Sequence, residues 1–171
     1  MNIYLVGYMC CGKTTIGKKL AKRLGYNFID LDQLFEKENN TSISNFFEEH
    51  GEAAFRVLET NILHSTALLP GNNVIATGGG TPCTANNMEW INENGISIYL
   101  SVNKGFIANR IVNSKQTTRP LLKNIPIDQI ANYVDEQLKI REQYYLKAQI
   151  INTTQNIDDI IEQLQPSSPP S

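Results

Sequence analysis

Gly7-Tyr-Met-Cys-Cys-Gly12-Lys13-Thr14 follows the pattern G-x-x-x-x-G-K-[ST] without adjustment. The apolar run at 2–6 predicts a short buried strand before it, and helical spacing of apolar residues over 13–24 predicts a helix after it. A strand, a glycine-rich turn and a helix in this order aim backbone N–H groups and the positive helix end at one anion. We expect a nucleotide phosphate site, with Lys13 on the β- and γ-phosphates and Thr14 on Mg²⁺. The alternative is a glycine-rich turn without a ligand.

Beyond this loop, short apolar runs alternate with helical patterns. This alternation predicts a parallel sheet covered on both faces, in one α/β domain over residues 1–165. The tail at 166–171, rich in proline and serine, is expected to be disordered. Strands are predicted at 2–6, 27–30, 73–76, 96–102 and 149–152, and helices at 13–24, after 30, at 51–69, 84–93 and 103–112, in a longest helix after about 126, and at 157–164.

The composition excludes several classes of protein. Of 171 residues, 41% are hydrophobic and 19% charged, which is a globular balance. The net charge of −2 comes without long runs of either sign, so we expect no nucleic-acid or membrane partner. Three cysteines without a C-x-x-C pair and only two histidines argue against disulfides and zinc, and favour a cytoplasmic protein.

The choice of nucleotide follows from a missing carboxylate. A guanine-binding N-K-x-D motif would need an aspartate where Phe106 stands, so the sequence favours ATP over GTP. The strand at 73–76 leads into Gly78-Gly79-Gly80 rather than into an acidic residue. This favours a transferase, which must avoid activating water, over a hydrolase.

Two carboxylates mark a place for the acceptor. Asp30 and Asp32 flank Leu31 at the carboxyl end of the second predicted strand, where parallel sheets bind ligands. An i, i+2 pair on a strand would point both toward the crevice, one for a water on Mg²⁺ and one for a substrate hydroxyl. Alternatively, Asp32 only caps the following helix.

Arginines and glycines complete the candidate acceptor site. Arg56 has Glu59 at i+3, which alone would be an ordinary surface ion pair. Arg141 falls on the apolar stripe of the predicted longest helix, where it must find an anion or reach solvent. The glycines at 78–80 let a flat ring approach the backbone. Arg119, in a polar loop, could close over the phosphates.

These motifs, in this order, resemble the shikimate kinase family. The resemblance rests on the phosphate loop, Asp30-x-Asp32, Phe55-Arg56-x-x-Glu59, the triple glycine and Arg119-Pro-Leu-Leu122, and it spans nearly the whole chain. It implies a three-layer P-loop kinase fold, similar to nucleoside-monophosphate kinases, with a five-stranded parallel sheet of order 2-3-1-4-5 and a mobile lid at about 113–125. It also implies transfer of the ATP γ-phosphoryl group to the 3-hydroxyl of shikimate, a step of aromatic amino-acid biosynthesis.

The resemblance also assigns roles to residues of this chain. Catalysis would depend on Lys13, Asp32 and Arg119. ATP would contact Cys10, Cys11, Gly12, Lys13, Thr14, Thr15, Arg119 and Gln155. Shikimate would contact Asp32, Arg56, Gly78, Gly79, Gly80 and Arg141, and Mg²⁺ would be held by Thr14 and Asp30.

Some features leave alternatives open. Gluconate kinase, or a regulatory module that binds ATP without turnover, would share the phosphate loop. Cys10 and Cys11 replace the usual small pair of the loop. Cys11, at a helix N-terminus beside Lys13, could be a reactive thiolate that ATP protects, or both cysteines could simply fit the loop. We expect a monomer.

Overall fold

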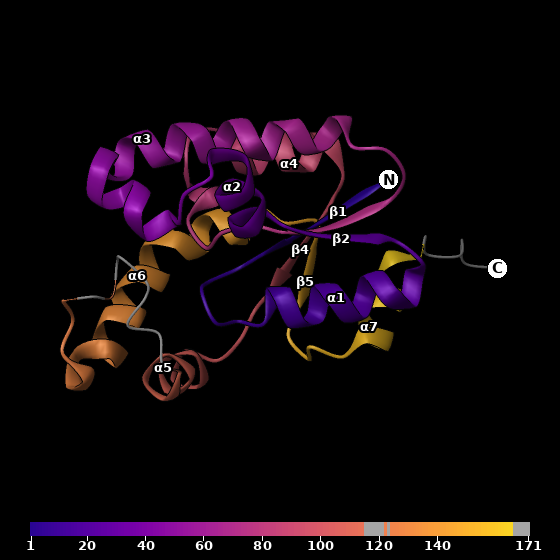
Figure 1. The fold of residues 1–171 in the computed structure, drawn as a ribbon. Coiled ribbons are helices and arrows are strands. Elements are labelled where there is room, and N and C mark those ends of the chain that lie inside the picture. The colour runs from indigo at the N-terminus through magenta and orange to yellow at the C-terminus, as the bar shows by residue number, and fades with distance from the viewer. Residues whose placement is uncertain (115–121, 123, 166–171) are drawn as a thin grey trace.

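Five parallel strands form the centre of the molecule (Figure 1). The structure, a computed structural model, describes residues 1–114, 122 and 124–165. The strand order is β2-β3-β1-β4-β5, so the predicted α/β class and sheet order are confirmed. The strands are β1 (Asn2–Val6), β2 (Asn27–Asp30), β3 (Asn73–Ala76), β4 (Ile96–Leu100) and β5 (Ile150–Asn152).

Helices cover both faces of this sheet, with α1 and α7 on one side and α2, α3 and α4 on the other (Figure 1). Short 3₁₀ turns lie at Thr66–Leu68, Thr81–Cys83 and Ile127–Gln129. The α-helices of the described residues are α1 (Lys13–Leu24), α2 (Leu31–Asn39), α3 (Ile43–Ser65), α4 (Asn87–Asn94), α5 (Lys104–Asn113), α6 (Ile130–Tyr145) and α7 (Ile157–Leu164).

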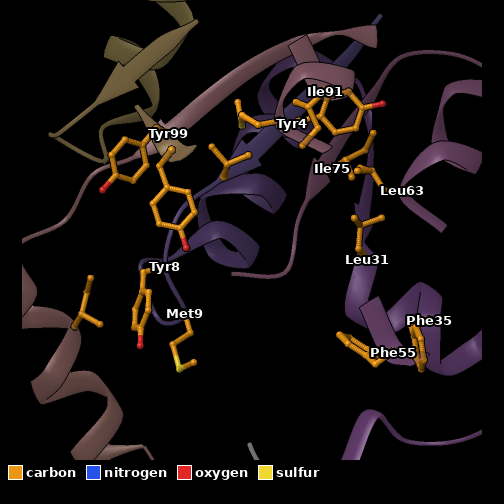
Figure 2. Close-up of a cluster of buried hydrophobic side chains, with 14 of the residues drawn as sticks. Tyr4, Tyr8, Met9, Leu31, Phe35, Phe55, Leu63, Ile75, Ile91 and Tyr99 are labelled. Carbon is orange, nitrogen blue, oxygen red and sulfur yellow. The ribbon is translucent and has the colours of Figure 1, made fainter. Parts of the chain in front are cut away.

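The alternation of side chains along β1 creates two cores. Ile3 and Leu5 pack with α1 and α7 residues on one face, whereas Tyr4 and Val6 point to the other. All four side chains are completely buried. Figure 2 shows part of the larger core, which extends from Tyr4 on β1 to Tyr8 and Met9 beyond the carboxyl end of this strand. Because both faces of the sheet are covered, the strand sequences are continuous apolar runs instead of alternating apolar and polar residues.

Some helix boundaries differ from the prediction. The predicted helix at 51–69 forms the part of α3 after a break at Gly51, and it ends at Ser65. Because the break at Gly51 divides the 23 residues of α3, α6 with 16 residues is the longest unbroken α-helix of the described residues, as predicted. The predicted helix at 84–93 begins only at Asn87, because a 3₁₀ turn containing Pro82 precedes it.

Two predicted features fall largely or wholly outside the described residues. The predicted lid spans 113–125, of which 115–121 and 123 are not described, and the predicted disordered tail at 166–171 is not described either. No helix in the described part of the chain is long and apolar enough to cross a bilayer.

Candidate active site

The phosphate loop joins β1 to α1 and closes around the ammonium group of Lys13. Lys13 Nζ donates hydrogen bonds to the carbonyl oxygens of Gly7 at 2.7 Å and Tyr8 at 2.8 Å. Gly12 adopts φ 101°, a left-handed conformation that is unfavourable for residues with a Cβ atom. The loop therefore holds one buried cation at the N-terminus of α1, the arrangement expected for binding phosphate.

The two predicted metal ligands lie next to each other. Thr14 Oγ1 donates to Asp30 Oδ2 at 2.8 Å, so a hydroxyl and a carboxylate oxygen share one place at the mouth of the loop. Oxygen ligands of this kind suit Mg²⁺, which is usually held by one or two protein groups together with substrate phosphates. The described residues contain no cluster of three or more His, Cys, Asp or Glu side chains that could hold a metal without such help.

Asp30 and Asp32 differ from the predicted strand pair. Asp30 ends β2 and caps α2, with its Oδ1 accepting from the backbone N–H of Asp32 at 3.1 Å. Asp32 lies in the first turn of α2, so it is neither on the strand nor the cap of the helix. The roles are thus divided by the strand-to-helix turn: Asp30 faces Thr14, and the Asp32 carboxylate faces the adjoining cavities.

A cavity of about 340 Å³ opens above the phosphate loop. Five of the predicted ATP-binding residues line it: Cys10, Gly12, Lys13, Thr14 and Thr15. The full lining also includes Met9, Asp30, Asp32, Thr77, Gly78, Gly79, Arg110 and Ser114. Arg119 lies outside the described residues.

Cys11 and Gln155 support the loop from below instead of lining the cavity. The Cys11 side chain is completely buried beneath the loop, and its Sγ accepts from Lys13 Nζ at 3.7 Å. Lys13 thus lies beside this thiol as predicted, but burial argues against the predicted reactivity. Gln155 Nε2 donates a hydrogen bond to the Cys11 carbonyl oxygen. This bond ties the segment after β5 to the phosphate loop.

Arg110 was not identified as a site residue from the sequence. Its Nη1 donates to the Cys10 carbonyl oxygen at 3.0 Å, and its guanidinium lies over the Phe106 ring, 4.2 Å from the centroid. The i, i+4 spacing of Phe106 and Arg110 at the end of a helix was the available signal. An arginine stacked at the rim of a phosphate site can contact a nucleotide.

A second cavity, of about 480 Å³, adjoins the first. Four residues line both: Met9, Asp32, Gly78 and Gly79. The remaining lining comes from α2, from α3 and its cap Ser42, from the turn at 78–80 (the glycine turn) and from α6. These residues are Gln33, Glu36, Ser42, Ile43, Ser44, Phe47, Arg56, Glu59, Gly80 and Arg141. All six predicted shikimate-binding residues are therefore brought together around one space.

Arg56 is held rigidly at the wall of the second cavity. Its Nη1 donates to Glu59 Oε2 at 2.8 Å and its Nη2 to Glu52 Oε1 at 3.1 Å. Burial lowers the pKa of Arg56, but the charges and hydrogen bonds of Glu59 and Glu52 outweigh it, so the pKa is raised. The pair with Glu59 is not an ordinary surface contact, because the two side chains are only 17% and 5% exposed.

Arg141 reaches the same cavity from α6. Its guanidinium carbon lies 5.4 Å from the centroid of the buried Tyr8 ring, within the range of a cation–π contact. Nearby, the Tyr145 hydroxyl donates to the Gly79 carbonyl oxygen at 2.5 Å and fixes the glycine turn. Two guanidinium groups thus face one cavity from different helices, which suits an anionic acceptor.

Comparison with known proteins identifies the family. A sequence model of the shikimate kinase family matches residues 9–166. The chain belongs to the shikimate kinase family. A shikimate kinase from Parabacteroides distasonis is 43% identical over 149 residues, covering 87% of this chain and 85% of the relative.

Solved structures of this family share the fold. The crystal structure of shikimate kinase from Bacteroides thetaiotaomicron is 37% identical, covers 96% of both chains and superposes with a TM-score of 0.86. The Acinetobacter baumannii shikimate kinase, solved in complex with shikimate, is 34% identical, covers 95% of this chain and 89% of that one, and has a TM-score of 0.83. A gluconokinase from Sinorhizobium meliloti, 16% identical with a TM-score of 0.59, is similar in fold alone.

Proposed function

We infer that the protein transfers the γ-phosphoryl group of ATP to the 3-hydroxyl of shikimate. The observation that carries this inference is the contact between the two cavities at Asp32, Gly78 and Gly79. The first cavity has the lysine and backbone of a phosphate loop, and the second has two arginines. A hydroxyl in the second cavity can therefore meet a terminal phosphate from the first. The shikimate bound in the Acinetobacter baumannii relative supports the choice of acceptor.

Each site residue then has a chemical task. Arg56 and Arg141 would bind the shikimate carboxylate, and Gly78, Gly79 and Gly80 would contact the ring. Asp32 would accept a hydrogen bond from the 3-hydroxyl, orient its oxygen for attack and take its proton as the new P–O bond forms. Lys13 would stabilise the negative charge on the transferring phosphoryl group, with Arg119 from the lid assisting.

The nucleotide side would be completed by Mg²⁺. Thr14 and Asp30 would hold the ion, because their oxygens already lie 2.8 Å apart at the mouth of the loop. When bound, Mg²⁺ neutralises charge on the β- and γ-phosphates. Cys10, Gly12, Thr15 and Arg110 would contact the nucleotide directly, whereas Cys11 and Gln155 would act by supporting the loop.

A coupled assay of ADP release tests the function. We expect turnover with ATP, Mg²⁺ and shikimate, little with gluconate, and almost none without an acceptor. Preference for gluconate would favour the gluconate kinase alternative, and ATP binding without turnover on either acceptor would favour the regulatory module. The Lys13→Met variant serves as the control, since it removes the phosphate-binding ammonium.

The organisation of the whole chain is also a proposal. We propose a single kinase domain over 1–165 with a lid at about 113–125, acting as a monomer in the cytoplasm. The two cores on opposite faces of one sheet support a single domain. Sedimentation analysis with and without both substrates measures the oligomeric state, and a dimer would contradict the proposed monomer.

A further inference from the structure

Beside Arg56 lies a buried pair formed by Glu59, at the wall of the cavity, and Thr81. Thr81 is completely buried, and its hydroxyl donates to Glu59 Oε1 at 2.6 Å. The other carboxylate oxygen, Oε2, accepts from Arg56. The two oxygens of Glu59 are thus divided between a fixed hydroxyl and the guanidinium that faces the cavity.

Thr81 is itself held in place from two directions. Its backbone N–H donates to the Gly78 carbonyl oxygen at 3.2 Å, which closes the glycine turn. Its carbonyl oxygen accepts from Asn87 Nδ2 at 2.9 Å, and this amide also donates to Thr60 on α3 at 3.0 Å. Since Asn87 is only 1% exposed, these bonds are shielded from water. The position of the Thr81 hydroxyl is therefore fixed by α3, α4 and the glycine turn together.

The side chains of this network pack tightly against the glycine turn. A Cβ atom on Gly78 would lie 2.6 Å from Glu59 Oε1 and 2.8 Å from Thr81 Oγ1. A Cβ atom on Gly80 would lie 2.5 Å from Arg56 Nη2. The glycine turn is thus packed directly against the side chains that orient Arg56, so a rotation of Glu59 would shift the guanidinium.

We propose that Thr81 is a positioning residue for acceptor binding, acting through Glu59 on Arg56. Without its hydroxyl, a buried carboxylate oxygen would lose its partner, and Glu59 would turn toward other donors or admit water. Arg56 would then lose the fixed direction needed for a two-point contact with a carboxylate. Thr81 itself is absent from the described linings of both cavities, so its effect on the acceptor would be indirect. The inference rests on the proposed function, in which Arg56 binds the acceptor.

The test compares Thr81→Val, which keeps the shape and removes the hydroxyl, with Thr81→Ser, which keeps the hydroxyl. Loss of a hydrogen bond to a charged group should raise KM for shikimate about tenfold or more in Thr81→Val. KM for ATP should stay within about twofold, because the nucleotide site does not involve Thr81. Thr81→Ser should restore KM for shikimate to near the wild-type value.

Thr66→Val is the matched control. Thr66 is also completely buried, and its hydroxyl donates to the Leu63 carbonyl oxygen at 2.6 Å, on the side of the core around Tyr4. Thr66→Val should lower the free energy of unfolding about as much as Thr81→Val does, and it should leave KM for shikimate and KM for ATP unchanged. If Thr81→Val does not fold, Thr81→Ala, which cannot overpack the site, carries the same expectation.

A double-mutant cycle separates positioning from a general structural effect. In an Arg56→Lys background, which lacks the planar fork, Thr81→Val should raise KM for shikimate no further. Full additivity of the two changes would overturn the proposal, as would a wild-type KM in Thr81→Val or a failure of Thr81→Ser to restore it. Wild-type protein that does not use shikimate would instead refute the proposed function, so the two failures are distinguishable.

Discussion

Asp32 is the ionisable residue among the four that line both cavities. We expect Asp32→Asn to lower kcat/KM for shikimate about a hundredfold or more, the range for losing a positioned base. KM for ATP should change little, because Lys13 and Thr14 remain. Steady-state kinetics with each substrate varied measures both values, and Asp158→Asn, at an exposed ion pair with Arg23, is the control. Wild-type turnover would remove Asp32 from the catalytic residues.

Arg141 lies over Tyr8 and contributes the second guanidinium of the acceptor cavity. Arg141→Lys keeps the positive charge but loses the planar fork that binds a carboxylate at two points. We expect KM for shikimate to rise about tenfold, with KM for ATP nearly unchanged. A larger effect on ATP than on shikimate would place Arg141 on the nucleotide side.

The three cysteines should differ in reactivity toward iodoacetamide at pH 8. Cys10 lines the nucleotide cavity and should be labelled first, with ATP and Mg²⁺ slowing the reaction. Cys11 is buried and should react only on unfolding. Burial raises the pKa of Cys83 to about 11, although nearby Arg141 and Arg56 oppose the shift. Its reactive thiolate is therefore about a thousandth of the population at pH 8, and its labelling should accelerate as the pH rises toward 11.

Mass mapping of the adducts distinguishes the three thiols. Early labelling of Cys11 in native protein, or labelling of Cys10 that ATP does not slow, would contradict this order.

At the scale of single elements, α3 supplies both ends of the acceptor cavity because it bends. Residues before Gly51, such as Phe47, line one side, and Arg56 and Glu59 after it line another. The helix changes direction near its N-terminal end (Figure 1). Gly51 has φ 79° and ψ 173°, a region essentially restricted to glycine. The bend thus depends on a residue without a side chain.

Gly51→Ala should therefore cost about 1 to 3 kcal/mol of unfolding free energy. The cause is backbone strain alone, since no atom lies within 4 Å of a Cβ at this position. KM for shikimate should rise as well, because the two halves of α3 would no longer meet at the same angle. Denaturant titration and kinetics measure the two effects. Glu93→Ala, at an exposed helical site, should change stability by less than about 0.5 kcal/mol; an equal loss in both variants would argue against strain.

At the scale of the whole molecule, one sheet and its two cores should unfold together. Fluorescence of the single tryptophan, Trp90, which packs against Tyr4, should follow the same transition as far-UV circular dichroism. Two separate transitions would contradict the proposed single domain.

Nucleotide should shift this transition through the phosphate loop. At about 100 times its dissociation constant, ATP with Mg²⁺ should add about 2.7 kcal/mol to the free energy of unfolding. GTP at the same concentration should add less. Lys13→Met should abolish the shift, since it removes the ammonium at the centre of the loop. A shift that survives this substitution would place the nucleotide elsewhere.

Local patterns were enough to predict the sheet and the phosphate loop. Apolar runs and helical spacing depend on neighbouring residues, so the strands, the α/β class and the loop at 7–14 could be predicted from the sequence. The strand order and the proximity of Thr14 to Asp30 were implied by the family resemblance instead. Burial and side-chain direction depend instead on contacts between residues far apart in the chain. Four features could therefore be seen only in the tertiary structure. Asp32 lies on a helix, Cys11 is buried, Arg110 contacts the phosphate loop, and Thr81 donates a hydrogen bond to Glu59.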